Sequence, residues 1–339
     1  MTLEQPQVSV LMSVYSEPID WIDQAVKSIL DQTLTDFEYI IVNDNPASAE
    51  LNNYLESLSK EDPRVRIIRN DSNIGLTKSL NVGLKQCRGK YIARMDADDW
   101  SFPTRLERQV DFMDANPAVI ASSAFAYSWD GGVSLRKIFR PESYEEILSY
   151  TFTSSPFIHP LLIMRREILT KHDVAYDESF PRSQDYKLAV DLLRVGKVVN
   201  QPEYLLKYRI SESQITSRFG SEQVELCKAI RRKYIADFYA KYCLGTPDEV
   251  ITYNAIKSSK RKAKSFLRST KLSKGEARNF KRSTNAIRRL YYYSLPSYSF
   301  KSMMGFLSSG DYFSYPYNLR RFLVILVKHF KSNIVPGLV

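Results

Sequence analysis

The chain has 339 residues, of which 44% are hydrophobic and 25% are charged, and its formal net charge is +10. This composition is typical of a globular protein and excludes collagen-like, low-complexity and wholly disordered chains. The charge is uneven, because residues 1–256 carry 30 basic and 36 acidic side chains, whereas residues 257–289 carry 13 basic side chains and the single acid Glu276.

No segment approaches the roughly 20 consecutive apolar residues that a membrane-spanning helix needs. The first residues lack the basic and apolar regions of a secretory signal, so we expect a cytoplasmic protein. Cys87, Cys227 and Cys243 have neither CxxC spacing nor evident histidine partners. The sequence therefore predicts neither a disulfide framework nor a zinc site.

The first part of the chain alternates strand-like and helix-like segments. Runs of β-branched and apolar residues predict strands, and apolar residues spaced three and four apart predict the helices between them. The expected strands are residues 8–14, 38–42, 65–68 and 91–95, and the expected helices are residues 21–30, 50–58 and 76–87. This order predicts an α/β fold, with a Rossmann-like, mostly parallel sheet covered by helices on both faces.

Regular alternation stops after an apolar run at residues 119–127, which ends at the turn sequence Asp130-Gly131-Gly132. Residues 142–152 and 185–194 have helical patterns, and residues 198–208 contain strand-like segments. After residues 245–247 the composition shifts towards helix formers and basic charge. We therefore expect an α/β domain over residues 1–245 and a basic, mainly helical region over residues 246–339.

Acidic side chains follow three of the expected strands. Glu17 comes after the first, Asp44 after the second, and the sequence Asp-Ala-Asp-Asp at residues 96–99 after the fourth. Because the carboxyl ends of parallel strands meet at one edge of a sheet, we expect these carboxylates to lie together. Clustered carboxylates repel one another, and Mg²⁺ or Mn²⁺ held by one or two of them and by substrate phosphate oxygens suits this spacing. The alternative is a solvated acidic turn, whereas an EF-hand is excluded because Trp100 and Ser101 replace the required oxygen ligand and glycine.

The sequence contains neither the glycine fingerprint of dinucleotide-binding folds nor a P-loop. If the sheet binds a nucleotide, a metal ion must therefore neutralise the diphosphate. Asp44 would suit a base or a ribose, since a carboxylate accepts hydrogen bonds from N–H groups and hydroxyls. The alternative is that Asp44 caps the turn Asn45-Pro46.

Five blocks of sequence occur in a fixed order. They are residues 8–30, 37–44 (FEYIIVND), 73–76 (NIGL), 89–99 (GKYIARMDADD) and 103–109 (PTRLERQ). Together they resemble family 2 glycosyltransferases (GT-A fold) of the bacterial surface-polysaccharide kind, over about residues 7–215. The resemblance implies an inverting transferase with a nucleotide-sugar donor, usually UDP-linked, and makes residues 1–245 its catalytic domain.

The resemblance also implies roles for individual residues. Asp44 would contact the base, Asp96 would lie near the ribose or sugar, and Asp98 would be the main metal ligand, with Asp99 beside it. The implied cofactor is Mn²⁺ or Mg²⁺. The other donor-binding positions implied by the matched blocks are Val14, Tyr15, Glu17, Asn73, Gly75, Arg94 and Ala97.

Asp185 lies in the block Ser183-Gln184-Asp185, which resembles the family block whose aspartate is the catalytic base. Inversion needs a base that removes the acceptor hydroxyl proton as the oxygen attacks the anomeric carbon. The alternative role for Asp185 is to cap the helix that follows it.

The block Phe157-Ile158-His159-Pro160 also resembles the family and implies that His159 lies near the acceptor or the donor phosphates. A histidine beside a proline is more often structural, so both interpretations stay open. One block departs from the family: many members have a histidine soon after a Tyr-Arg pair, and this chain has Tyr208-Arg209-Ile210-Ser211.

The last part of the chain predicts an amphipathic basic helix. Its apolar residues recur at helical spacing over residues 319–330, and tyrosines precede them. This pattern predicts a peripheral anchor on an anionic membrane surface. The alternative is a helix packed on the body of the protein or on a partner subunit.

We therefore expect a metal-dependent inverting glycosyltransferase that moves a hexosyl or N-acetylhexosaminyl group. Its acceptor would be a glycan or a lipid-linked hydroxyl in the synthesis of capsule, O-antigen or lipooligosaccharide, on the cytosolic face of the inner membrane. A nucleotidyltransferase is disfavoured because residues 15–20 contain no basic, glycine-rich loop for a triphosphate. A non-enzymatic polyanion-binding protein is disfavoured because nothing basic marks the expected cleft, so no nucleic-acid partner is expected. The sequence leaves a homo-oligomer open.

Overall fold

The computed structural model describes residues 5–130, 132, 135–210, 220–242, 244 and 253–293. The chain forms two compact units, of which the first comprises Met1–Ile147 and Ser154–Ile230 and the second comprises Leu148–Thr153 and Arg231–Val339. The domain boundary expected between residues 245 and 246 lies outside the described residues and stays a prediction. The same holds for the amphipathic helix expected at residues 319–330.

The secondary structure alternates in the first part of the chain, as expected. The strands are β1 (Val8–Val14), β2 (Phe37–Asn43), β3 (Val65–Arg69), β4 (Tyr91–Arg94), β5 (Trp100–Ser101), β6 (Val119–Trp129), β7 (Leu135–Ile138), β8 (Ile163–Arg165) and β9 (Lys197–Arg209). The helices are α1 (Ile19–Leu30), α2 (Ala49–Glu61), α3 (Leu76–Leu84), α4 (Arg105–Ala115), α5 (Tyr144–Tyr150), the short 3₁₀ helix η1 (His159–Leu161), α6 (Arg166–Lys171), α7 (Gln184–Val195), α9 (Gly220–Lys241), α10 (Tyr253–Ser269) and α11 (Lys274–Tyr293).

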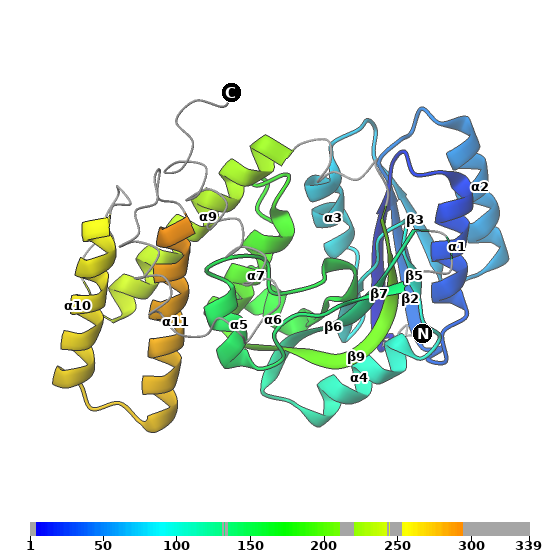
Figure 1. Cartoon of the computed structure of the whole chain (residues 1–339). Helices are drawn as coiled ribbons and strands as arrows, with labels where there is room; N and C mark the ends of the chain where they lie inside the picture. The colour runs from blue at the N-terminus through cyan, green and yellow to red at the C-terminus, as the bar shows by residue number, and fades with distance from the viewer. Residues whose placement is uncertain are drawn as a thin grey trace, which may run out of the picture. The chain divides into compact units, whose positions relative to one another are not determined.

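The strands of the first unit form one sheet in the described part of the chain, in the order β3-β2-β1-β4-β8-β6-β9-β5, with β7 paired to β6. β3, β2, β1 and β4 run parallel, and so do β6 and β9, whereas β8 is antiparallel to both of its neighbours. Figure 1 shows α1 and α2 on one side of the strands and α3 on the other. The predicted α/β fold with a mostly parallel sheet is confirmed.

Local sequence explains the central strands and the first helix. All seven residues of β1 and of β2 are buried, which is typical of parallel strands covered on both faces. In α1 the buried apolar residues Ile22, Ala25, Val26 and Ile29 recur at helical spacing, so this face packs into the core.

The sequence did not predict the shortest strands. β8 has three residues and β5 has two, which is too short for any periodicity to be recognised. β5 exists because it pairs with the long strand β9, where Trp100 lies opposite Lys207. Residues 198–208, expected as separate strand-like pieces, form the single strand β9.

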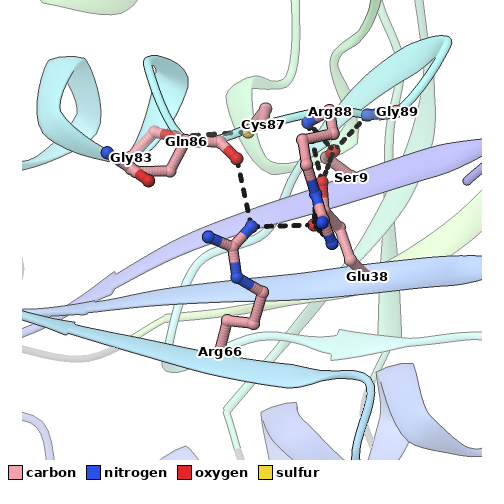
Figure 2. Close-up of polar contacts among 8 residues, drawn as sticks. All are labelled: Ser9, Glu38, Arg66, Gly83, Gln86, Cys87, Arg88 and Gly89. Atoms are coloured by element: carbon pink, nitrogen blue, oxygen red, sulfur yellow. Dashed lines mark hydrogen bonds and ion pairs between the residues drawn. The ribbon is translucent and has the colours of Figure 1, made fainter. Parts of the chain in front are cut away.

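A cluster of polar contacts links the amino-terminal ends of β1, β2 and β3 to the turn before β4 (Figure 2). The Glu38 side chain is 4% exposed and accepts hydrogen bonds from the Ser9 hydroxyl, at 2.6 Å, and from the backbone N–H and guanidinium of Arg88. Arg66 Nη1 donates to the same carboxylate at 3.0 Å. Burial alone would raise the pKa of Glu38, but these donors outweigh it, and the net pKa lies below its usual value.

Two of the three cysteines lie among the described residues. Cys87 is a free, buried cysteine near the same cluster, its thiol donates to the Gly83 carbonyl oxygen, and burial raises the pKa of that thiol to about 12. Cys227 is also free, and its sulfur lies 3.3 Å from the Ser183 hydroxyl. Cys243 lies outside the described residues.

The second unit contains α10, α11 and the last part of α9. Its apolar side chains meet in an aromatic cluster, in which the Phe280 ring lies 4.8 Å from that of Phe266 and 5.7 Å from that of Phe238. Several basic residues of the two helices are exposed, among them Lys260, Lys264, Arg268, Arg278 and Lys281. Within the described residues, no helix combines the length and the apolar character required to span a bilayer.

Candidate active site

The carboxyl ends of β2, β1 and β4 lie side by side in the sheet, which brings the predicted site loops to one edge. Backbone bonds tie these ends together: Asp44 N donates to the Val14 carbonyl oxygen at 2.9 Å, and Met95 N donates to that of Leu11 at 3.0 Å. The Asn45 amide donates to the Tyr15 carbonyl oxygen, and Tyr15 N donates to the Glu17 carboxylate at 2.8 Å. The first and second of the expected acidic loops are therefore neighbours.

Asp44 holds the loop that leads into α3. Its side chain is 2% exposed, and its two oxygens accept hydrogen bonds from the Asn70 amide (2.8 Å), from Ile74 N (2.9 Å) and from Gly75 N (2.9 Å). Gly75 has a φ of 85°, in the left-handed region that favours glycine. Asp44 thereby fixes Gly75, the N-cap of α3, together with Asn73, whose side chain also accepts a hydrogen bond from Gly75 N.

The alternative role considered for Asp44, a cap of the turn that follows, belongs to its neighbour. The Asn43 side chain accepts the hydrogen bond from Asn45 N at 2.8 Å. The expected contact of Asp44 with a nucleotide base stays a prediction.

The carboxylates at residues 96–99 are partly buried against one another. The pKa of Asp98 is raised to about 7, mainly by burial and to a lesser extent by the negative charges of Asp96 and Glu17. Burial, followed by Asp98 and Asp96, raises the pKa of Asp99 well above its usual value. Asp96 is paired with the buried guanidinium of Arg94. Since the charge of Glu17 contributes to the raised pKa of Asp98, the loops after β1 and β4 are close enough to interact electrostatically, as predicted.

Asp99 is the most deeply buried of the three, at 1% exposure. Its Oδ1 accepts a hydrogen bond from Arg209 N at 2.8 Å, and its Oδ2 is buried without a hydrogen-bond partner among the described residues. A buried, unpartnered carboxylate oxygen is costly and calls for a proton or a cation.

Acidic residues from distant parts of the chain influence the pKa of two side chains, His159 and Tyr208. Asp96 and Asp185 both act on His159, and Asp99, Asp96, Asp98 and Asp185 all raise the pKa of Tyr208, after burial as the main cause. The charge of Asp185 therefore acts on the same two side chains as the charge of Asp96.

Asp185 occupies the first turn of α7 and is not its N-cap, since the cap residue is Ser183. A carboxylate in the first turn is favoured by the helix dipole. The expected role of Asp185 as the catalytic base stays a prediction.

His159 is held by Tyr176, a residue that no sequence pattern singled out. Its Nε2 lies 2.8 Å from the hydroxyl of Tyr176, which is 2% exposed, and the two rings meet edge to face. Burial, with the charge of Arg94, lowers the pKa of His159 to about 4, so the imidazole is neutral at pH 7. The Tyr176 backbone is fixed through two hydrogen bonds with the Asn81 side chain.

The remaining predicted donor-binding residues differ in exposure. Val14, Arg94 and Ala97 are buried. Tyr15 is 45% exposed at the end of β1. Their expected contacts with a donor stay predictions.

The acidic cluster suits a metal ion that takes only one or two of its ligands from the protein. Among the described residues, no group of three or more histidine, cysteine, aspartate or glutamate side chains is arranged to hold a metal. Asp98, with the unpartnered Oδ2 of Asp99, could supply one or two oxygens, and a magnesium-type ion takes its other ligands from water and substrate phosphate. These oxygen ligands therefore suit a cation whose remaining coordination positions are filled by a nucleotide diphosphate.

Comparisons with known proteins identify the family and the fold. Residues 9–173 match the family described as Glycosyl transferase family 2. An uncharacterized glycosyltransferase of Methanocaldococcus jannaschii is 36% identical over 61% of this chain and 72% of its own length. The amylovoran biosynthesis glycosyltransferase AmsE of Erwinia amylovora is 31% identical over 62% of this chain and 79% of its own length. Among solved structures, S. aureus TarS 1–349 in complex with UDP-GlcNAc has a TM-score of 0.56 at 16% identity, covering 84% of this chain and 91% of that one, a similarity of fold.

Proposed function

The chain belongs to glycosyltransferase family 2, and from that premise we propose that it is a metal-dependent, inverting transferase with a UDP-linked donor. The observation that carries the proposal is that the charges of Asp96, Asp98, Asp99 and Asp185 all reach Tyr208, near the end of β9, and add to the effect of burial in raising its pKa. The UDP-GlcNAc bound to the structurally similar TarS supports the choice of donor.

The residues divide the chemistry between them. Asp98, with Asp99, would hold Mn²⁺ or Mg²⁺, which supplies positive charge to the departing diphosphate. Asp185 would accept the proton of the acceptor hydroxyl as its oxygen attacks the anomeric carbon from the opposite face. His159 is neutral at pH 7 and would offer a hydrogen bond rather than a charge to the sugar or phosphates.

The acceptor would be a glycan or lipid-linked hydroxyl in surface-polysaccharide synthesis. The named role of AmsE in amylovoran biosynthesis supports this class of acceptor. A hexosyl or N-acetylhexosaminyl group is the expected cargo.

Two variants test this function. Asp98→Asn should abolish Mn²⁺-dependent binding of UDP in calorimetry, because the main anionic ligand is lost. Asp185→Asn should leave that binding intact and lower turnover by about 10²–10⁴-fold, the usual contribution of a general base. Full activity in excess EDTA would contradict the metal role, and near-normal turnover of Asp185→Asn would contradict the base.

We also propose that the second unit docks on an anionic lipid surface, at the cytosolic face of the membrane that carries a lipid-linked acceptor. The support is a set of exposed basic side chains on α10, α11 and the turn between them, none of which forms an ion pair within the part of the chain that the structure describes. These side chains are Lys260, Arg261, Lys264, Arg268, Lys271, Lys274, Arg278 and Lys281. A basic residue near such a surface contributes about 1 kcal/mol of binding energy.

Vesicle sedimentation tests this docking. The full chain should sediment with phosphatidylglycerol vesicles, should be released as salt is raised, and should not sediment with phosphatidylcholine vesicles. A triple variant Lys260→Glu, Lys264→Glu, Arg268→Glu should stay in solution, while Lys60→Glu on the exposed side of α2 should not change binding. Equal binding of the triple variant, or a preference for duplex DNA over the vesicles, would overturn the proposal.

A further inference from the structure

Arg209, the last residue of β9, binds the acidic loop at two points. Its Nε donates to the Asp98 carbonyl oxygen at 2.6 Å, and its backbone N–H donates to Asp99 Oδ1 at 2.8 Å. The residue is 5% exposed, and its burial lowers the pKa of the guanidinium, while Asp98 and Asp99 favour the charged form. Arg209 is therefore a buried cation that contacts two predicted metal ligands, the backbone of Asp98 and the side chain of Asp99.

The guanidinium is fixed from two other directions. It lies between two indole rings, 4.5 Å from the ring centre of Trp21 in α1 and 4.2 Å from that of Trp129 at the end of β6. Its Nη2 donates to the Gln24 side chain in α1 at 2.9 Å. Stacking and hydrogen bonding together leave the group one orientation, because a planar cation between two rings cannot rotate freely.

The sheet explains why these groups meet. Trp129 and Arg209 are opposite each other in the parallel pair of β6 and β9, and Trp100, which follows the acidic loop directly, lies opposite Lys207. The loop at residues 96–99 is therefore attached to the end of β9, and Arg209 joins it to α1 and β6.

We propose that Arg209 is a positioning residue for the metal and the donor diphosphate. It holds the backbone from which the Asp98 carboxylate projects, so that this carboxylate can meet a cation without rearrangement. The inference rests on the proposed function, since it assigns Arg209 to the metal site of that reaction. Groups that orient metal ligands in this way typically affect metal affinity by about 10–100-fold.

A lysine cannot replace this arginine. A single ammonium group could reach either the Asp98 carbonyl oxygen or Gln24, but it lacks the planar fork that reaches both and the flat face that stacks between the rings. Arg209→Lys thus keeps the charge and removes the geometry of the guanidinium, and it retains the backbone N–H that donates to Asp99.

The test measures UDP binding by calorimetry at increasing MnCl₂ in the full chain. We expect Arg209→Lys to raise the half-saturating Mn²⁺ concentration by about tenfold or more. Gln24→Ala should shift it in the same direction by a smaller factor, with an unchanged circular dichroism spectrum. The matched control is Arg165→Lys, because Arg165 is also buried and binds the carbonyl oxygens of Val119 and Met113 at the other edge of the sheet. It should lower the melting temperature without changing the Mn²⁺ dependence.

The outcomes separate the inference from the function. If the unaltered chain shows no Mn²⁺-dependent UDP binding, the proposed function fails. If it does, and Arg209→Lys and Gln24→Ala both bind Mn²⁺ within twofold of it, the positioning role is overturned. Should Arg209→Lys fail to fold, Gln24→Ala alone decides between the two results.

Discussion

Replacement of Glu38 by alanine should destabilise the first unit by about 3 kcal/mol without changing turnover. The carboxylate is buried and accepts hydrogen bonds from Ser9, Arg66 and Arg88. Loss of one partner of a buried ion pair costs about 3–5 kcal/mol. The lower end applies because the two arginine side chains are 37% and 46% exposed and can return to water. That loss is a large share of the roughly 5–15 kcal/mol that stabilises a typical domain.

The assay is urea unfolding followed by tryptophan fluorescence. All three tryptophans, Trp21, Trp100 and Trp129, belong to the first unit, so the signal reports on that unit alone. The control Glu203→Gln removes the partner of Arg108 in an exposed ion pair and should change the unfolding free energy by less than about 0.5 kcal/mol.

The cost of removing Glu38 should also depend on pH. The pKa of Glu38 is lower in the folded chain than its usual value of 4.5, so its contribution is fully present above pH 4.5 and is lost as the pH falls through the folded pKa. Equal unfolding free energies for Glu38→Ala and the unaltered chain at pH 7 would refute this reasoning. So would a large fall in turnover of the folded variant.

Two further predictions concern the carboxyl edge of the sheet. Gly75→Ala should lower the unfolding free energy by about 1–2 kcal/mol, because φ is positive at this residue. The control Gly275→Ala should be neutral or stabilising, because Gly275 has no positive φ and has open space around it. Equal melting temperatures of the two variants in calorimetry would refute this difference. His159→Gln should flatten the pH dependence of stability between pH 6.5 and about 4, since the pKa of His159 is lowered in the folded state and the unfolded chain alone takes up the proton as the pH falls. Urea titrations at pH 7 and pH 4.5 measure this, and an unchanged slope would contradict it.

Local sequence was sufficient for the central sheet and for the positions of the acidic loops. The runs at β1 and β2 are rich in β-branched and apolar residues, and an acid follows each, so the strand ends could be recognised from the sequence alone. The order of sequence blocks then identified the family, which the comparisons confirmed.

Contacts between residues far apart in the chain could not be predicted from the sequence. Arg209 was noticed only because a histidine is missing after it, and its meeting with Asp98, 111 positions earlier, depends on the pairing of β5 with β9. Tyr176 carries no local pattern at all, and its contact with His159 arises from the chain path between α6 and α7. The buried Asp44 was expected beside a ligand, and only the coordinates reveal that it also orders residues 70–75.

The pairing of β6 with β9 has a consequence for synthesis on the ribosome. β6 ends at Trp129 and its parallel neighbour ends at Arg209, so the growing polypeptide must lengthen by many residues before the second strand can dock. Until then Asp99 lacks the N–H donor that satisfies it. Nascent chains released early should therefore expose an unfinished sheet border and be selected by chaperones or proteases.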